Sequence, residues 1–326
     1  MPTLNELLHA ASRTFALGID LLPRPLRGEV EVAYLLLRVS DYLEDNESME
    51  AALKAELLEA WARALEVPSP DSRLISALEA AEDGTPDALV ARHAEAVHQA
   101  LRGLRPAARE IVGRHVADST RGMARWALRG PDIGDEADLD DYMHEVAGRV
   151  GWLLTELFAL DIPAVDRRRA SMMALGRDFG LALQTVNVIR GLHADWTRGW
   201  VFVPRAFVPA SGADPAALFQ GRRDRDAERV VLARLVEKAE GHLEAARRYV
   251  AGIPARHHGV RLFCLLPYFF AVRTLAVSAD NPSVFEEETK IGRADVRRTV
   301  IASRWLGWSD AWVAWYARRL RERAPG

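Results

Sequence analysis

The sequence predicts an all-α protein built as one large domain. Apolar residues recur with the period of a helix along almost the whole chain, and the strict alternation typical of strands is nearly absent. Clusters of proline and glycine separate these periodic segments, and no segment has the composition of an interdomain linker. The 326 residues are 49% hydrophobic and 27% charged, as in a globular protein with a sizeable core. We therefore expect about ten helices in a single domain, residues 1–326, packed around a central space.

The helical segments follow one another between recognisable breaks. The first long helix is predicted over residues 28–45, directly after Pro23 and Pro25. The further predicted helices cover residues 51–66, 88–103, 104–129, 138–160, 166–196, 225–251, 257–279 and 292–323. The segment 197–224, rich in glycine, proline and arginine, is the longest irregular connection.

Composition excludes several functional classes. The net charge of −3 argues against an electrostatic nucleic-acid binder. The single cysteine, Cys264, excludes an intramolecular disulfide and a thiolate metal cluster, and its apolar neighbours predict a buried side chain. The N-terminus lacks the pattern of a secretory signal, and no stretch approaches the roughly 20 apolar residues of a membrane span. We expect a cytoplasmic protein that an apolar substrate could still draw to a membrane surface.

The predicted helix 28–45 carries an acidic face. Tyr34, Arg38, Asp41 and Asp45 stand at i, i+4, i+7 and i+11, and Glu44 joins the edge of this row. The rest of the helix is largely apolar and so predicted to be buried, where carboxylates are costly unless paired or bound to metal. Mg²⁺ prefers carboxylate oxygens and shares its shell with substrate phosphate. The alternative is a structural ion pair in which Arg38 neutralises an aspartate, and spacing alone does not decide between the two.

A second polar face lies near the end of the predicted helix 166–196. Gln184, Asn187, Gly191 and Asp195 share one side at i, i+3, i+7 and i+11, and Arg190 lies beside this row. Two such helices facing each other would enclose a cavity that is polar at one end and apolar at the other. A cavity of this kind suits an isoprenoid diphosphate.

These motifs resemble the squalene and phytoene synthases, the head-to-head branch of the isoprenoid synthases. The resemblance covers nearly the whole chain and rests on Ser12-Arg-Thr-Phe15, YLLLRVSDYLED (34–45), YMHEVAGRVG (142–151), LALQTVNVIR (181–190), LPYFFAVRTL (266–275) and NPSVFEEETKI (281–291). It implies a single all-α domain of the isoprenoid-synthase type around a central hydrophobic cavity. It also implies a prenyltransferase that uses Mg²⁺ to ionise an allylic prenyl diphosphate, farnesyl or geranylgeranyl, and couples it to a second one. Squalene synthases then reduce the cyclopropyl intermediate with NADPH, but the chain shows no dinucleotide-binding fingerprint.

The resemblance also assigns residues to roles. Its catalytic set comprises Phe15, Tyr34, Arg38 and Tyr142, the last a tyrosine implicated in proton handling. Its substrate-binding set comprises Ser12, Arg13, Gln184, Asn187 and Arg190. The metal ligands are expected to be Asp41, Glu44, Asp45 and Asp195.

Two positions depart from the family pattern. The second motif reads Arg-Asp-x-x-x-Asp in the family, but here Gly191 stands in place of the first aspartate. An arginine expected to bind phosphate is replaced by Trp200, with Arg198 two positions earlier. Three hypotheses follow. The favoured one is head-to-head condensation of two prenyl diphosphates. The second is transfer of one prenyl group to a non-diphosphate acceptor, such as an aromatic molecule bound by Trp200. The third is a non-catalytic isoprenoid-binding protein.

Four tryptophans mark the predicted last helix. They stand at i, i+3, i+7 and i+10, so we expect them to share a face and to pack on the body of the domain: Trp305, Trp308, Trp312 and Trp315. The alternative is an interfacial helix whose arginines meet anionic lipid: Arg318, Arg319, Arg321 and Arg323.

Overall fold

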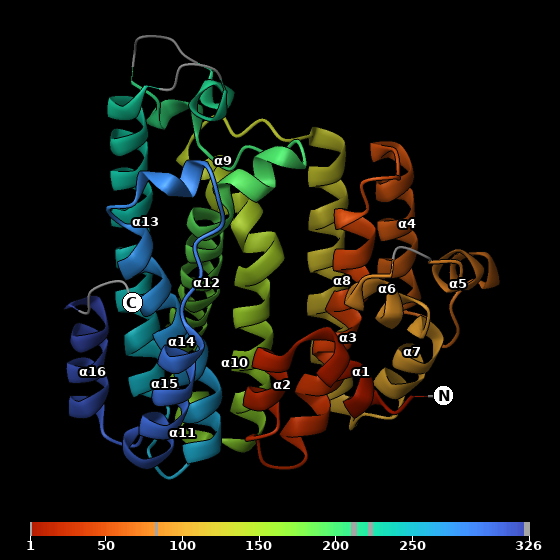
Figure 1. The fold of residues 1–326 in the computed structure, drawn as a ribbon. Helices are drawn as coiled ribbons and strands as arrows, with labels where there is room; N and C mark the ends of the chain where they lie inside the picture. The colour runs from red at the N-terminus through yellow and green to blue at the C-terminus, as the bar shows by residue number, and fades with distance from the viewer. Residues whose placement is uncertain (1, 82–83, 210–213, 221–223, 323–326) are drawn as a thin grey trace. The chain divides into compact units, whose positions relative to one another are not determined.

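A computed structural model describes residues 2–81, 84–209, 214–220 and 224–322, except for the side chain of Arg13 (Figure 1). All regular secondary structure in these ranges is helical, which confirms the all-α prediction. The chain forms two compact units, residues 1–130 with 149–173 and residues 131–148 with 174–326. The single domain and its central cavity stay predictions.

The first unit is organised around α3 (Leu26–Asp45). This helix is packed by neighbours on several sides, and Leu35, Leu36, Val39 and Leu43 on it are fully buried. The helices that complete this unit are α1 (Leu4–Ala11), α2 (Arg13–Ile19), α4 (Ala51–Ala64), α5 (Ser72–Glu79), α6 (Pro86–Ala91), α7 (Ala94–Arg102), α8 (Pro106–Arg129), α10 (Arg149–Asp161) and α11 (Pro163–Asp166). Burial of the apolar residues of α3 therefore fixes the orientation of the acidic face that it carries.

The second unit is built on long helices: α12 (Arg169–Thr197), which begins in the first unit, α13 (Arg225–Gly252) and α14 (His258–Ser278). Helix α14 packs against α13, α15 (Arg293–Leu306) and α16 (Asp310–Glu322). The shorter elements are α9 (Glu136–Met143), the π-helix η1 (His144–Gly148), and the 3₁₀ turns η2 (Arg205–Phe207), η3 (Pro215–Phe219) and η4 (Pro282–Phe285).

Helix α14 corrects one expectation from the sequence. Its length and mean hydropathy of 1.6 would let it cross a membrane, contrary to the expectation that no stretch approaches a span. However, 78% of its most apolar window is buried inside the protein, as in the core helix of a globular unit. Cys264 lies in this helix and is buried as predicted, and its burial raises the pKa of the thiol.

Three predicted helices are divided in the structure. Residues 88–103 fall in α6 and α7, residues 138–160 in α9, η1 and α10, and residues 292–323 in α15 and α16. The last division makes the tryptophan prediction wrong. A turn at 307–309 changes the helical phase, so Trp305, Trp308 and Trp315 are exposed. Only Trp312 packs inward, stacked on Tyr316 with ring centroids 4.8 Å apart.

Candidate active site

The acidic face of α3 contains an ion pair between its first aspartate and an arginine one turn earlier. Asp41 accepts a hydrogen bond from Arg38, and another guanidinium nitrogen of Arg38 lies 3.4 Å from Asp87 Oδ1 on α6. The guanidinium carbon also lies 5.4 Å from the centroid of the Tyr34 ring. The ion pair that spacing left as an alternative is therefore present. Since a carboxylate has about four lone-pair directions, this pairing leaves room for a cation on Asp41.

A polar and aromatic wall adjoins this pair. Ser12 caps α2 by accepting a hydrogen bond from the backbone N–H of Phe15 at 3.2 Å. The Phe15 ring lies 5.7 Å from that of Tyr34. Burial raises the pKa of Tyr34, although Arg38 and a hydrogen bond to Ser12 oppose the shift, so the phenol is protonated at neutral pH. The first unit thus brings five of the expected site residues, from two separate sequence motifs, into one cluster: Ser12, Phe15, Tyr34, Arg38 and Asp41.

The chemistry of this face fits Mg²⁺ shared with a diphosphate. Glu44 is half-buried and Asp45 is exposed, one turn beyond Asp41. No group of three or more His, Cys, Asp or Glu side chains in the described ranges is arranged to hold a metal by itself. Mg²⁺ is usually held by one or two carboxylates and completes its shell with water and phosphate oxygens. Asp41 and Asp45 are carboxylates of the type and number that such a site uses, one turn apart on α3.

Asp87 is the residue of this cluster that the sequence analysis missed. It belongs to the first turn of the short helix α6, which shares no periodicity with α3. Only its distance from Arg38 in the folded unit connects it to the site.

The second polar face lies on α12, in the second unit. Gln184, Arg190, Gly191 and Asp195 are half-buried, and Asn187 is exposed. The charged members are paired within the chain. Arg190 Nε lies 3.4 Å from Glu288 Oε1, and Asp195 accepts a hydrogen bond from Arg198. The carbonyl of Arg190 also accepts from the backbone N–H of Thr289 at 3.4 Å, so the segment after η4 lies against the end of α12.

An aromatic stack adjoins this face. The ring centroids of Trp200 and Phe202 are 5.4 Å apart, those of Tyr142 and Phe202 4.6 Å, and those of Tyr142 and Trp200 5.9 Å. The backbone N–H of Trp200 donates to the carbonyl of Asp195 at 2.9 Å, and the turn between them passes through Gly199 with φ +83°. Trp200 is therefore held close to the carboxylate end of the second face and against Tyr142.

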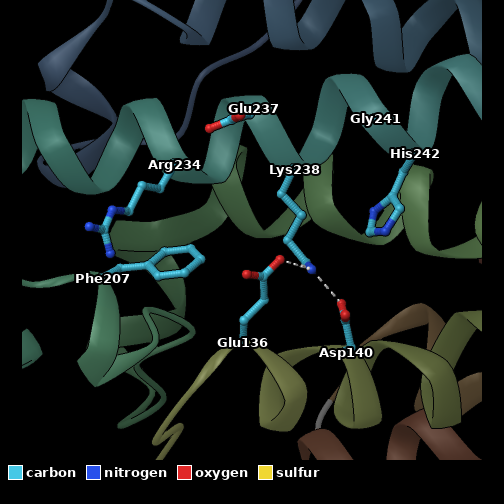
Figure 2. A pocket seen from close by; sticks show the side chains of 8 residues that line it. All are labelled: Glu136, Asp140, Phe207, Arg234, Glu237, Lys238, Gly241 and His242. Atoms are coloured by element: carbon cyan, nitrogen blue, oxygen red, sulfur yellow. Dashed lines mark hydrogen bonds and ion pairs between the residues drawn. The ribbon is translucent and has the colours of Figure 1, made fainter.

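Close helix packing positions Tyr142. A Cβ at Gly180 on α12 would lie 2.2 Å from the carbonyl oxygen of Ala147, so α12 and η1 approach at a distance that only glycine permits. Lys238, 6% exposed, extends from α13 to Glu136 at 2.6 Å and Asp140 at 2.7 Å on α9 (Figure 2). Helix α9, which carries Tyr142, is thereby fixed against two long helices of its own unit.

A polar pocket of about 630 Å³ lies between α9, η2 and α13 (Figure 2). Its lining comprises Glu136, Asp140, Phe207, Arg234, Glu237, Lys238, Gly241 and His242. None of the predicted site residues belongs to this set. Its lysine, Lys238, is paired with two carboxylates of α9.

Comparison with known proteins decides the family. The family model described as Squalene/phytoene synthase matches residues 8–299. The chain belongs to the squalene/phytoene synthase family. Human squalene synthase is 27% identical over 330 aligned residues, which cover all of this chain and 75% of the human protein. Squalene synthase ERG9 of Saccharomyces cerevisiae is 27% identical, covering 98% of this chain and 70% of the yeast protein.

Solved structures agree with this assignment. "The complex structure of TcSQS with ligand, E5700" superposes with a TM-score of 0.81 at 25% identity, covering 98% of this chain and 91% of that one. A dehydrosqualene synthase in complex with ligand has the same fold, with a TM-score of 0.66 at 18% identity over 97% of this chain and 95% of that one. Members of the family are prenyltransferases, and this squalene/phytoene synthase relative is therefore a transferase of isoprenoid biosynthesis.

The two positions at which the sequence motifs were interpreted as departing from the family pattern both lie beside Asp195. A Cβ at Gly191 would lie 3.4 Å from Asp195 Oδ2. Trp200 donates its backbone N–H to the carbonyl of Asp195 and joins the aromatic stack. The two faces belong to different units, so the prediction that they face one another across a cavity stays a prediction. The side chain of Arg13, also predicted to bind substrate, lies outside the described part.

Proposed function

We propose that this protein is a Mg²⁺-dependent synthase that ionises an allylic prenyl diphosphate on the α3 face and condenses it head-to-head with a second prenyl diphosphate. Head-to-head condensation is the reaction of its family, and all but the ends of the chain match the family model. The observation that carries the assignment of residues is the cluster of Arg38, Asp41, Tyr34, Ser12 and Phe15 in one folded unit.

The residues of this cluster have different roles in ionisation. When the C–O bond of the allylic diphosphate breaks, its electron pair leaves with the diphosphate, and negative charge grows on the phosphate oxygens. Bound Mg²⁺ would neutralise that charge as a Lewis acid, and Asp41, Glu44 and Asp45 would hold it. Arg38 and the protonated Tyr34 donate hydrogen bonds to the same oxygens. Phe15, which is 42% exposed, would offer its π face to the allylic cation.

Coupling requires the second face. A new carbon–carbon bond forms between the cation and the double bond of the second prenyl chain, and loss of one proton closes a cyclopropane that keeps the second diphosphate. We assign that proton to Tyr142, which is 8% exposed within its aromatic stack. Gln184, Asn187 and Arg190 would bind the retained diphosphate, and Asp195 would share its metal. The Asp-Tyr-Leu-Glu-Asp form of the first motif and the stretch 281–291 resemble squalene synthases more than phytoene synthases, which favours a squalene-type product. The use of NADPH as the reductant of that product would follow from analogy with squalene synthases alone.

One observation favours a second candidate function, transfer of a single prenyl group to an aromatic acceptor. Gly191 removes a carboxylate and Trp200 adds a ring stacked on Phe202 and Tyr142. Both changes weaken binding of a second diphosphate, and the indole offers a flat apolar surface to an aromatic molecule.

Product analysis separates the two candidates. The protein is incubated with geranyl, farnesyl or geranylgeranyl diphosphate and Mg²⁺, with and without NADPH and an indole or phenol acceptor. A cyclopropyl diphosphate or a C30 or C40 hydrocarbon is the expected result. A prenylated acceptor without such products would support the second candidate, and absence of diphosphate release under every condition would overturn both.

A matched pair of variants tests the α3 face. Asp41→Asn removes a metal ligand while keeping its size, and we expect diphosphate release to fall about a hundredfold or more. Glu47→Gln removes a charge just beyond the end of α3, at an exposed position, and should leave the rate unchanged. Equal rates in both variants would exclude the α3 face as the ionising site.

A further inference from the structure

Exposed indole rings gather at the turn between α15 and α16. Trp305 is 73% exposed and Trp308 57% exposed, and Leu306 between them is exposed as well. The indole N–H of Trp308 donates to the backbone carbonyl of Trp305 at 3.1 Å, which places the two residues side by side. Large rings displayed in this way lose apolar stabilisation unless something covers them.

The turn that displays them is fixed from beneath. Arg261, 1% exposed on α14, donates to the carbonyl of Gly307 at 3.2 Å and to Asp310 at 2.5 Å. A Cβ at Gly307 would lie 2.5 Å from the carbonyl oxygen of Ser303 and 2.9 Å from Leu265, so the backbone here is tightly packed. The rings are thus held by a rigid support, which lowers the entropy cost of binding.

The exposed residues around the rings are cationic. Residues 293–322 contain seven arginines and three carboxylates, a net charge of +4 in a chain whose net charge is −3. Two of these carboxylates, Asp295 and Asp310, are already paired with Arg273 and Arg261 of α14. Six of the arginines are exposed and form no ion pair with other described residues: Arg293, Arg297, Arg298, Arg304, Arg318 and Arg319. All but Arg293 stand within about one helical turn of the apolar exposed residues Ile301 and Trp305 on α15 or Trp315 on α16.

We infer that these two helices and their turn form a docking surface for an anionic lipid bilayer. Tryptophan prefers the boundary between hydrocarbon and headgroups, and arginine is attracted by acidic headgroups. A second copy of the chain fits less well, because a two-fold interface across this surface would bring a charge of +4 against its own image. The surface carries none of the proposed catalytic residues.

Vesicle co-sedimentation tests this inference. The full chain is mixed with phosphatidylcholine vesicles containing 30% phosphatidylglycerol or with pure phosphatidylcholine vesicles. We expect binding to the anionic vesicles, with at least tenfold weaker partitioning for the Trp305→Ser/Trp308→Ser variant. Arg304→Glu should weaken binding about fivefold or more, since each cation near the surface contributes about 1 kcal/mol. Binding should also fall steeply with added salt.

Matched controls separate docking from misfolding. Leu128→Ser removes an apolar side chain that is exposed on α8, and Arg102→Glu reverses an exposed charge at the end of α7. Both should bind vesicles as the parent does, and circular dichroism should show all variants folded. Failure of the parent chain to bind anionic vesicles, or equal weakening in the control variants, overturns the inference. So does light scattering showing that the tryptophan variants dissociate a dimer while vesicle binding is unchanged.

Discussion

Replacing Gly191 by aspartate restores the carboxylate that the second face lacks. Position 191 lies within α12, and its Cβ would lie 3.4 Å from Asp195 Oδ2, so aspartate fits with a small adjustment of that side chain. Like charges one helical turn apart cost about 0.2–0.5 kcal/mol. Aspartate recovers roughly 0.3 kcal/mol of helix propensity relative to glycine. We therefore expect the free energy of unfolding without metal to change by less than about 0.5 kcal/mol.

Bound Mg²⁺ changes the effect of this substitution. One unit charge attracts another by about 1 kcal/mol at 4 Å in bulk water, so a divalent cation gains about 2 kcal/mol from the new carboxylate. This corresponds to a factor of about 30 in affinity. Asp195 also accepts a hydrogen bond from Arg198, and this bond offsets part of the negative charge that Asp195 presents to the metal. The dissociation constant of Mg²⁺ in the presence of inorganic diphosphate should accordingly fall about ten- to thirtyfold.

Isothermal titration of Mg²⁺ into the protein with inorganic diphosphate measures this change directly. Gly191→Asn is the matched control, because asparagine has the size of aspartate without its charge. If the asparagine variant gains as much affinity, or the aspartate variant gains none, then position 191 does not face the diphosphate. Adding Trp200→Arg to Gly191→Asp should then increase head-to-head coupling relative to single prenyl transfer.

Three further predictions concern the scaffold of the second unit. Gly180→Ala should lower the free energy of unfolding by about 3 kcal/mol, because its Cβ would meet the backbone of Ala147 at 2.2 Å. Gly241→Ala should raise the free energy of unfolding by up to about 1 kcal/mol, because no atom lies within 4 Å of the added Cβ. Urea denaturation of both variants measures this contrast, and a common sign would contradict it. Burial, assisted by Lys238, lowers the pKa of His242 below 6.5, so only the unfolded chain takes up this proton as the pH falls below 6.5. The free energy of unfolding should then decrease by up to about 1.4 kcal/mol for each pH unit below 6.5. His242→Asn should flatten this dependence on pH, and an unchanged slope would exclude His242 as its origin. Lys238→Met should lower the free energy of unfolding by about 1–2 kcal/mol, which is less than the loss of a fully buried ion pair, because the two carboxylate partners are partly exposed. An unchanged free energy of unfolding in urea denaturation would show that these ion pairs do not stabilise the unit.

The sequence predicts the long helices well because their apolar periodicity extends over many turns. The predicted helices 28–45 and 225–251 correspond to α3 (Leu26–Asp45) and α13 (Arg225–Gly252). Short helices such as α1 and α5, of eight residues each, span too few turns to show a period. The capping box of Thr3 and Glu6 marks the start of α1 in the sequence, but it is a local motif and not part of a hydrophobic periodicity.

The same distinction applies to the candidate site. Tyr34, Arg38 and Asp41 share one helix face, so their proximity follows from spacing alone. Asp87 joins them from α6 through tertiary packing, which no spacing rule reveals. The exposure of Trp305 and Trp308 likewise depends on where α15 ends, and that point is set by the close packing around Gly307.

The paired charges of the second face sharpen the choice between the two proposed acceptors. Arg190 is near Glu288, and Asp195 is bonded to Arg198, so both charged residues of the altered motif already have partners within the chain. To bind here, a second diphosphate with its metal would have to break these ion pairs and form new ones with the same residues. Because the diphosphate carries a high negative charge, this exchange is favourable only if enough ligands converge on it. An aromatic acceptor would need no such exchange, because the stack of Trp200, Phe202 and Tyr142 is already assembled. On the proposed assignment of residues, condensation would require Glu288 and Arg198 to release their partners, whereas single prenyl transfer would not. Glu288→Gln, which frees Arg190 without touching the aromatic stack, should increase coupling of two diphosphates and leave transfer to an aromatic acceptor unchanged. If product analysis of this variant shows the opposite pattern, the pairing of Arg190 does not control the acceptor.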